Sequence, residues 1–365
     1  MREILVVGGG PAGLSAAAEA AKLGAEVEVI EEDGEAGIPE HCAGLVSLKG
    51  LHLVIGTSAP VIREIRGFKV FTPSGRAYTA RGNQAKAAVV DRPALEKELL
   101  RAAEKAGASV KFSTKYSGIE HCKVLLNAEG TKGAVSKRLG LQVPESIPAA
   151  QLDLETQDYE EDLVEIHLGD FAPDFFAWVV PRKGSVRVGL ATRSGVPLRI
   201  LEWMLEKGRL AGRFPGAKRG RPIFGKVVTG GPLRRAEAGR AIAIGDAGGF
   251  VKPTTGGGVV LGCLTARLAA RAAVRFIQEG AALDSFSTEW KKAYGREFYL
   301  MKAAMRVYRR MRAEEMEALF SALEEGGVLA EITQYDMDLQ GKALTRALRT
   351  RALFRLLPAI LRSFL

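Results

Sequence analysis

The chain of 365 residues contains little cysteine, asparagine or histidine. Its three cysteines, Cys42, Cys122 and Cys263, are too few and too scattered for a disulfide framework. The four histidines lack the spacing of metal ligands, so we expect no metal site. No apolar stretch reaches the roughly 20 residues of a membrane span, and the N-terminus does not read as a signal peptide. These absences predict a cytoplasmic protein in a reducing setting, and the scarcity of asparagine hints at a thermophile.

Negative charge is missing from the end of the chain. Residues 341–365 carry one lysine, five arginines and no acidic residue, and the net charge of the whole chain is +10. Such an excess favours an anionic partner, namely phospholipid, nucleic acid or an acidic protein. In residues 342–365 leucine and phenylalanine interleave with arginine, which is typical of an amphipathic helix on an anionic membrane or of a terminal helix packed on the protein body. A second basic stretch, residues 218–235, is interpreted as solvated surface.

The N-terminal segment has the pattern of a dinucleotide-binding βαβ unit. A buried strand at 4–7 leads into a glycine turn, a helix at 14–23 and a second strand at 26–30. The first glycine of the turn permits its tight bend, the second lets the backbone approach a pyrophosphate, and the third lets helix and strand pack closely. The acid that follows the second strand can accept hydrogen bonds from a ribose. The residues predicted to bind are Gly8, Gly10, Pro11, Ala12, Gly13 and Glu31.

Two later glycine motifs extend this prediction to FAD. A strand at 241–244 is followed by Gly245 and Asp246, whose carboxylate can reach the hydroxyls of a sugar-like chain. A helix over 259–278 follows a loop whose bare N–H groups would face the flavin and stabilise negative charge on it. The loop residues predicted to bind are Pro253, Gly256, Gly257 and Gly258. Together with the middle motif at 127–130, these segments fit one long cofactor.

The motifs resemble the FAD fold of the para-hydroxybenzoate hydroxylase type. The resemblance implies that Arg92 lies near the phosphates or ribityl chain of FAD, and that Ala128, Glu129 and Gly130 line the cofactor. Most members of that fold have an aspartate where this chain has Glu129.

Two further blocks resemble the geranylgeranyl reductase family. They are residues 176–190, with an aromatic-x-Trp-x-x-Pro pattern and a Val-Gly pair, and residues 39–44, with a Pro-x-x-Cys pattern. Val180 and Ala43 depart from the family pattern. The resemblance implies an enzyme that saturates isolated prenyl double bonds, in archaea on membrane ether lipids, by hydride transfer from the flavin and addition of a proton. It places Cys42 and Ala43 at the flavin.

Such a reaction requires a water-poor apolar slot above the flavin and an acid near the alkene. Trp178 is the candidate wall of the slot, with core packing as the alternative for its aromatic neighbours Phe175 and Phe176. Cys42 is the candidate for proton donor, redox modulator or small buried residue. Cys42 and Trp178 are therefore the predicted catalytic residues.

The predicted fold class is α/β, with a Rossmann-like FAD-binding domain interrupted by a substrate domain. We expect the first domain in residues 1–58, 84–144 and 231–285. An antiparallel sheet from residues 59–83 and 145–230 would form the second, and residues 286–365 would be a C-terminal helical region. The short stretch between residues 110 and 124 leaves little room for a β-meander.

Other functions fit the same cofactor motifs. A flavin monooxygenase or halogenase shares the FAD cradle, an electron-transfer flavoprotein would cycle the flavin without reducing an alkene, and a basic membrane- or nucleic-acid-binding protein would use the fold only structurally. No second G-x-G-x-x-G is present, so we expect no separate NAD(P)H domain. Ferredoxin or transiently bound NAD(P)H are the candidate electron donors, a prenylated lipid is the expected substrate, and no nucleic-acid partner is expected.

Overall fold

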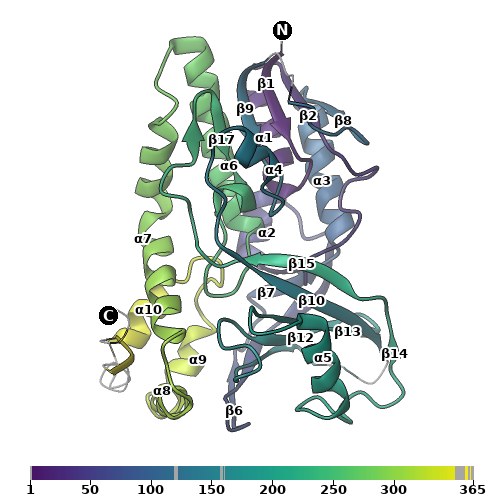
Figure 1. Cartoon of the computed structure of the whole chain (residues 1–365), viewed down its shortest axis with the longest axis vertical. Coiled ribbons are helices and arrows are strands. Elements are labelled where there is room, and N and C mark those ends of the chain that lie inside the picture. Colours follow the sequence, from purple (N-terminus) through teal and green to yellow (C-terminus); the bar gives the residue numbers. More distant parts are fainter. Residues whose placement is uncertain are drawn as a thin grey trace.

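A computed structural model describes residues 2–118, 122–156, 159, 161–349, 358–360 and 362. The first sheet has six strands in the order β16-β17-β9-β1-β2-β8 and combines strands from residues 2–127 with two from residues 237–243 (Figure 1). All neighbours in this sheet are parallel except β16 and β17. The strands are β1 (Arg2–Val7), β2 (Val27–Ile30), β8 (Ser109–Lys111), β9 (Cys122–Asn127), β16 (Glu237–Ala238) and β17 (Ala241–Ala243).

Both faces of this sheet are buried, which explains why its strands are continuous apolar runs. Ile4 and Val6 of β1 face a core shared with the helices, whereas Leu5 and Val7 face a smaller core on the opposite side. The helices of this part are α1 (Pro11–Lys22), α2 (Leu48–Ile55), α3 (Arg92–Lys105), α4 (Ala134–Arg138) and α6 (Val259–Glu279). Short helix α4 and nearby loops cover the second face. The chain runs from β8 to β9 with no described strand between them, in agreement with the short stretch seen in the sequence.

Alanines let α1 and α6 pack closely against each other. Ala16, Ala17 and Ala20 of α1 and Ala266 and Ala269 of α6 belong to the same buried core. Small side chains allow two helix backbones to approach, so the start of α1 and the start of α6 are brought together below the carboxyl ends of the strands. This close packing places the first and third glycine motifs next to each other, since a Cβ at Gly245 would lie 2.7 Å from Ala12 Cβ.

The second sheet has eight strands in the order β14-β10-β13-β12-β11-β5-β6, with β15 also paired to β10. They are β5 (Gly67–Phe71), β6 (Ala77–Arg81), β10 (Ser146–Glu155), β11 (Leu163–His167), β12 (Ala177–Arg182), β13 (Ser185–Ala191), β14 (Lys218–Arg219) and β15 (Ile223–Val228). One face packs against α5 (Pro197–Glu206) through Leu152, Val188, Leu201 and Met204.

The expectation of a purely antiparallel second sheet is wrong at one position. Strand β5 pairs with β11 in parallel, because the chain returns to the sheet after a long excursion rather than through a hairpin. In addition, β4 (Val61–Ile65) does not join this sheet. It forms a three-stranded sheet with β3 (Leu45–Ser47) and β7 (Ala87–Val90), in the order β3-β7-β4. The proposed domain boundary near residue 59 is therefore crossed by backbone pairing.

The C-terminal region is helical, as the sequence predicts. It comprises α7 (Ser285–Tyr308), α8 (Ala313–Glu325), α9 (Val328–Ile332) and α10 (Gly341–Leu348). Figure 1 shows α7 as the long helix at the left edge, beside α6 and reaching down to the second sheet. Within the described residues, no helix is long and apolar enough to cross a membrane. Most of the basic tail beyond residue 349 lies outside the described residues.

Candidate functional site

The first glycine turn is shaped by contacts that only glycine allows. Gly8 has φ 107°, and a Cβ there would lie 2.3 Å from the carbonyl oxygen of Ala128. A Cβ at Gly13 would lie 2.0 Å from the carbonyl oxygen of Gly8. By contrast, nothing lies within 4 Å of a Cβ built at Gly10, which precedes α1 without a side-chain cap. The first and third glycines are thus required by packing, and the second leaves free backbone at a helix N-terminus, which favours an anionic group.

Glu31 stands at the end of β2 and holds the glycine turn. Its carboxylate accepts hydrogen bonds from the N–H of Gly9 at 2.6 Å and from the N–H of Asp33 at 2.9 Å. The side chain also lines the cavity described below. Its predicted contact with a ribose stays a prediction, and the structure adds a second role in shaping the turn.

Glu129 lines the cavity, and its carboxylate is held at the start of α4. Its carboxylate accepts hydrogen bonds from Val135 N at 2.8 Å, from Ser136 N at 2.6 Å and from Asn127 Nδ2 at 3.0 Å. Although burial raises the pKa of this carboxyl group, the hydrogen bonds outweigh it and lower the pKa overall. The extra methylene compared with aspartate thus lets the carboxylate satisfy N–H groups at the start of α4.

Arg92, Cys42 and Asp246 meet although they lie far apart in the sequence. Arg92 begins α3 and forms an ion pair with Glu96 one turn later. Burial alone would lower the pKa of Arg92, but interaction with Cys42 and Glu96 raises it. Burial raises the pKa of Asp246, and the positive charge of Arg92 partly offsets this. The guanidinium is therefore the electrostatic centre of the site, and its place near the phosphates or the ribityl chain of FAD stays a prediction.

The loop before α6 is fastened to the C-terminal region by a buried ion pair. Lys252 Nζ donates to Asp338 Oδ1 at 2.5 Å and to the carbonyl of Met337 at 3.2 Å. The other carboxylate oxygen of Asp338 accepts from Ser47 N at 2.9 Å. A Cβ at Gly257 would lie 2.7 Å from Lys252 Cε, so the lysine packs directly on this glycine. No local sequence pattern indicates this pair, because its two members are 86 residues apart.

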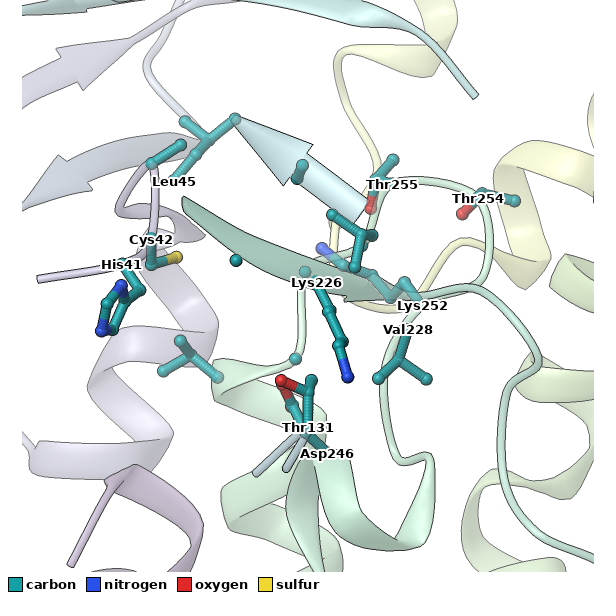
Figure 2. Close-up of a pocket in the computed structure, with 18 of the residues that line it drawn as sticks. His41, Cys42, Leu45, Thr131, Lys226, Val228, Asp246, Lys252, Thr254 and Thr255 are labelled. Carbon is teal, nitrogen blue, oxygen red and sulfur yellow. The ribbon is translucent and has the colours of Figure 1, made fainter. Parts of the chain in front are cut away.

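These residues surround one continuous cavity of about 1670 Å³. Every residue predicted to bind or catalyse lines it except Pro253, which packs beside Gly231 instead. Figure 2 shows part of the wall, where Cys42 and His41 lie on one side and Thr254, Thr255 and Lys252 on the other. Lys226, which the sequence assigns to solvated surface, is exposed but also lines the cavity and points toward Asp246 and Thr131 (Figure 2).

The end of the cavity between the second sheet and the C-terminal helices is apolar. Among its lining residues are Val70, Ile166, Phe176, Met305, Met316 and Phe320. Trp178 also lines it and packs edge-on against Phe176, with ring centroids 6.2 Å apart. The indole lies over Gly189 of the neighbouring strand, where a Cβ would stand 2.3 Å from Trp178 Cε2. Trp178 and Gly189 of the Val-Gly pair, which belong to one sequence pattern at 176–190, therefore contact each other across neighbouring strands.

Unpartnered polar atoms test whether FAD fits this site. Arg92 Nε and Thr255 Oγ1 are buried and have no hydrogen-bond partner among the described residues, and both residues line the cavity. Buried donors are normally satisfied, so these two call for acceptor atoms from a bound molecule. With the open backbone at Gly10, they offer hydrogen-bond donors to a molecule bound in the cavity. The residues present fit a long cofactor that is anionic at its centre.

Comparison with known proteins agrees with this geometry. Residues 3–128 match the family described as FAD dependent oxidoreductase. A digeranylgeranylglycerophospholipid reductase of Methanopyrus kandleri is 28% identical over 90% of this chain and 91% of its own. The enzyme of the same name from Methanocaldococcus jannaschii is 28% identical over 88% of this chain and 90% of its own.

Solved structures show the same fold over nearly the whole chain. A geranylgeranyl bacteriochlorophyll reductase-like protein from Thermoplasma acidophilum has a TM-score of 0.85 at 20% identity, covering 99% of this chain and 98% of its own. A flavin-dependent brominase has a TM-score of 0.73 at 16% identity, covering 99% of this chain and 98% of its own. At these identities the likeness is one of fold.

The class of the protein follows from the fold and the matched family: it is an FAD-dependent oxidoreductase. The predicted α/β fold and the FAD cofactor are thereby confirmed. Within that class the chain is similar over about nine tenths of its length to two digeranylgeranylglycerophospholipid reductases, and in fold to a geranylgeranyl bacteriochlorophyll reductase-like protein, which supports the resemblance found in the sequence.

Proposed function

We propose that the protein saturates isolated C=C bonds of geranylgeranyl chains attached to a glycerol ether lipid. The observation that carries this proposal is the cavity, which joins a dinucleotide-type site to an apolar chamber without interruption. Its volume of about 1670 Å³ exceeds the roughly 300–1,000 Å³ of a single small-molecule site, so it has room for a cofactor and a long chain. The names of the relatives support the same substrate class.

We assign separate roles to residues at different positions along this cavity. We propose that Gly10, Arg92 and Asp246 hold the phosphates and the ribityl chain of FAD. Bound FAD supplies the hydride for such a reduction. Trp178 and Phe176 exclude water from the alkene, which matters because a positive charge developing on carbon would be captured by water. Cys42, beside Arg92 at the junction of the two regions, is the candidate proton donor.

The alternative of a monooxygenase or halogenase rests on fold alone, because the halogenase neighbours are below 25% identical. Such an enzyme would consume oxygen after reduction. We therefore propose an anaerobic test. The purified protein is reduced with dithionite under argon and given a geranylgeranylated ether lipid, and the products are analysed by mass spectrometry. A gain of two hydrogens per double bond supports the reductase. Reoxidation of the flavin without saturated lipid contradicts it.

A matched pair of tryptophan variants makes the test specific to the chamber. Trp178→Ala opens the wall next to the chain and is expected to lower turnover at least tenfold while FAD stays bound. Trp203→Ala is the control, since Trp203 is 51% exposed on α5 and does not line the cavity. Equal losses in both variants would argue against a substrate-facing role for Trp178.

The electron donor and the membrane contact are further proposals. Ferredoxin and NAD(P)H are distinguished by anaerobic stopped-flow, in which the true donor bleaches the flavin absorbance at catalytic rates.

We propose peripheral membrane contact through residues 342–365. Leu344 and Leu348 of α10 line the cavity, so the start of this segment packs on the protein body, as one of the two sequence interpretations holds. Sedimentation with anionic vesicles, compared between the full chain and a chain ending at residue 349, tests whether the remainder binds lipid.

A further inference from the structure

The loop that carries Cys42 is held by an arginine of the second sheet. Arg187 on β13 is 1% exposed. Its Nη1 donates to the carbonyl oxygen of Cys42 at 2.5 Å, and its Nη2 donates to Glu40 Oε2 at 3.1 Å. Both Nε and Nη2 also donate to the carboxylate of Asp153, each at 2.7 Å. One guanidinium thus links Asp153 of the sheet with Glu40 and Cys42 of the loop.

This arginine and Trp178 lie on the same face of the sheet. Asp153 is the cross-strand partner of Arg187, and Gly189, two residues after Arg187, supports the indole of Trp178. Alternate residues of a strand share one face, so the anchor of the Cys42 loop and the wall of the apolar chamber belong to one surface. A second contact from that surface reaches the loop, because Gln151 Nε2 donates to the carbonyl of His41 at 3.0 Å.

Arg187 and Gln151 hold the loop through the carbonyls of Cys42 and His41 and through the Glu40 carboxylate, so none of these bonds uses the Cys42 thiol. The sulfur accepts a hydrogen bond from Gly44 N at 3.4 Å and lies next to Arg92. Arg187 therefore determines where the thiol stands without contacting it. The bidentate geometry to Asp153 is the kind that lysine cannot reproduce, because a guanidinium presents a planar fork and an ammonium does not.

We infer that Arg187 is a positioning residue for the reaction: it fixes the distance between the Cys42 thiol and the Trp178 wall. The part of this inference that concerns turnover rests on the proposed function. A displacement of about 1 Å in a reacting group can cost about a hundredfold in rate. Loosening the loop should therefore lower kcat and leave KM for the lipid nearly unchanged.

The test is Arg187→Lys, with Arg213→Lys as the matched control. Arg213 also makes a bidentate pair, with both oxygens of Glu165 at 2.6 Å. Glu165 lines the cavity and Arg213 does not, but no hydrogen bond of this pair reaches the Cys42 loop, so the pair is a control for the position of the thiol. Alkylation of Cys42 by iodoacetamide is followed by peptide mass spectrometry, and FAD affinity is measured by titration of the apoprotein. Neither readout requires lipid turnover.

For Arg187→Lys we expect at least a fivefold change in the rate of Cys42 alkylation, a kcat at least tenfold lower and an unchanged KM. Arg213→Lys should match the wild type in the rate of Cys42 alkylation. Wild-type alkylation kinetics together with wild-type kcat in Arg187→Lys would overturn the inference. Equal changes in both variants would overturn it as well, because they would indicate a general loss of sheet stability.

A second variant decides the matter if Arg187→Lys does not fold. Glu40→Gln keeps the pair between Arg187 and Asp153 and weakens the contacts that Arg187 and Arg182 make with the Glu40 carboxylate of the loop. We expect about a twofold change in Cys42 alkylation in this variant, and no change would count against the inference. If the wild type reduces no lipid, the proposed function fails, yet the alkylation comparison still tests the positioning role.

Discussion

The contact between Trp178 and Gly189 allows a quantitative test of the chamber wall. In Gly189→Ala the new Cβ would lie 2.3 Å from Cε2, 2.4 Å from Cζ2 and 2.5 Å from Nε1 of the indole. To restore an ordinary carbon–carbon separation of about 3.5 Å, the ring must move by about 1.2 Å. Gly189 lies within strand β13, outside the set of glycines with positive φ, so the perturbation is steric and not conformational.

Two costs follow from that displacement. Overpacking of a filled interior typically costs about 1–3 kcal/mol, and Phe176 on one side of the indole limits the directions in which the ring can retreat. At about 2–4 °C per kcal/mol, we expect Tm to fall by roughly 2–12 °C. The ring would move toward the cavity, so we also expect lower turnover.

A double-mutant cycle measures the contact directly. Tm and the free energy of unfolding in urea are compared for Gly189→Ala, Trp178→Ala and the double variant. Without the indole the added methyl group has room. When Gly189→Ala is added to Trp178→Ala, it should therefore lower the free energy of unfolding by less than about 0.5 kcal/mol. Gly225→Ala on β15 is the stability control, since nothing lies within 4 Å of its Cβ. Additive losses, or a wild-type Tm in Gly189→Ala, would refute the reasoning.

Two other buried ion pairs give predictions of their own. Burial raises the pKa of Glu165, but hydrogen bonds from Arg213 and His167 outweigh it and lower the pKa to about 2. A carboxyl group with a depressed pKa stabilises the fold above its unfolded pKa, which is about 4.5 for Glu165. We therefore expect the free energy of unfolding in urea to fall as the pH drops from about 4.5 toward 2. This fall should be shallower in Glu165→Gln. For Lys252→Met, which leaves the carboxylate of Asp338 buried without its cation, we expect a loss of about 3–5 kcal/mol in urea unfolding. The double variant with Asp338→Leu should recover part of that loss, and a double variant no better than the single one would show that the cost comes from elsewhere.

Much of the cofactor site could be predicted from local sequence. A tight turn, a helix start and a buried strand each depend on residues within a few positions, because glycine conformation, side-chain periodicity and helix N-termini act locally. For this reason the turn at Gly8–Gly13, the placement of Asp246 after a strand and the helix that follows could be predicted. The resemblance added the pairing of Trp178 with a Val-Gly segment, and the structure shows the steric reason for it.

Other features of the site depend on contacts between distant parts of the chain. The hydrogen bond from Arg187 to Cys42 joins residues 145 apart, and the ion pair from Lys252 to Asp338 joins residues 86 apart. Likewise, no local pattern distinguishes a lysine on solvated surface from Lys226, which lines the cavity.

The sequence by itself determined the cofactor type, the α/β class and the chemistry of the individual segments, since each is encoded in short runs of residues. Only the tertiary structure decided that these segments enclose one cavity, that β5 pairs in parallel with β11 and that the carboxylate of Glu129 turns to a helix start. The physical reason is that packing and charge pairing are satisfied across the whole molecule, whereas a sequence motif records only the backbone and side chains next to it.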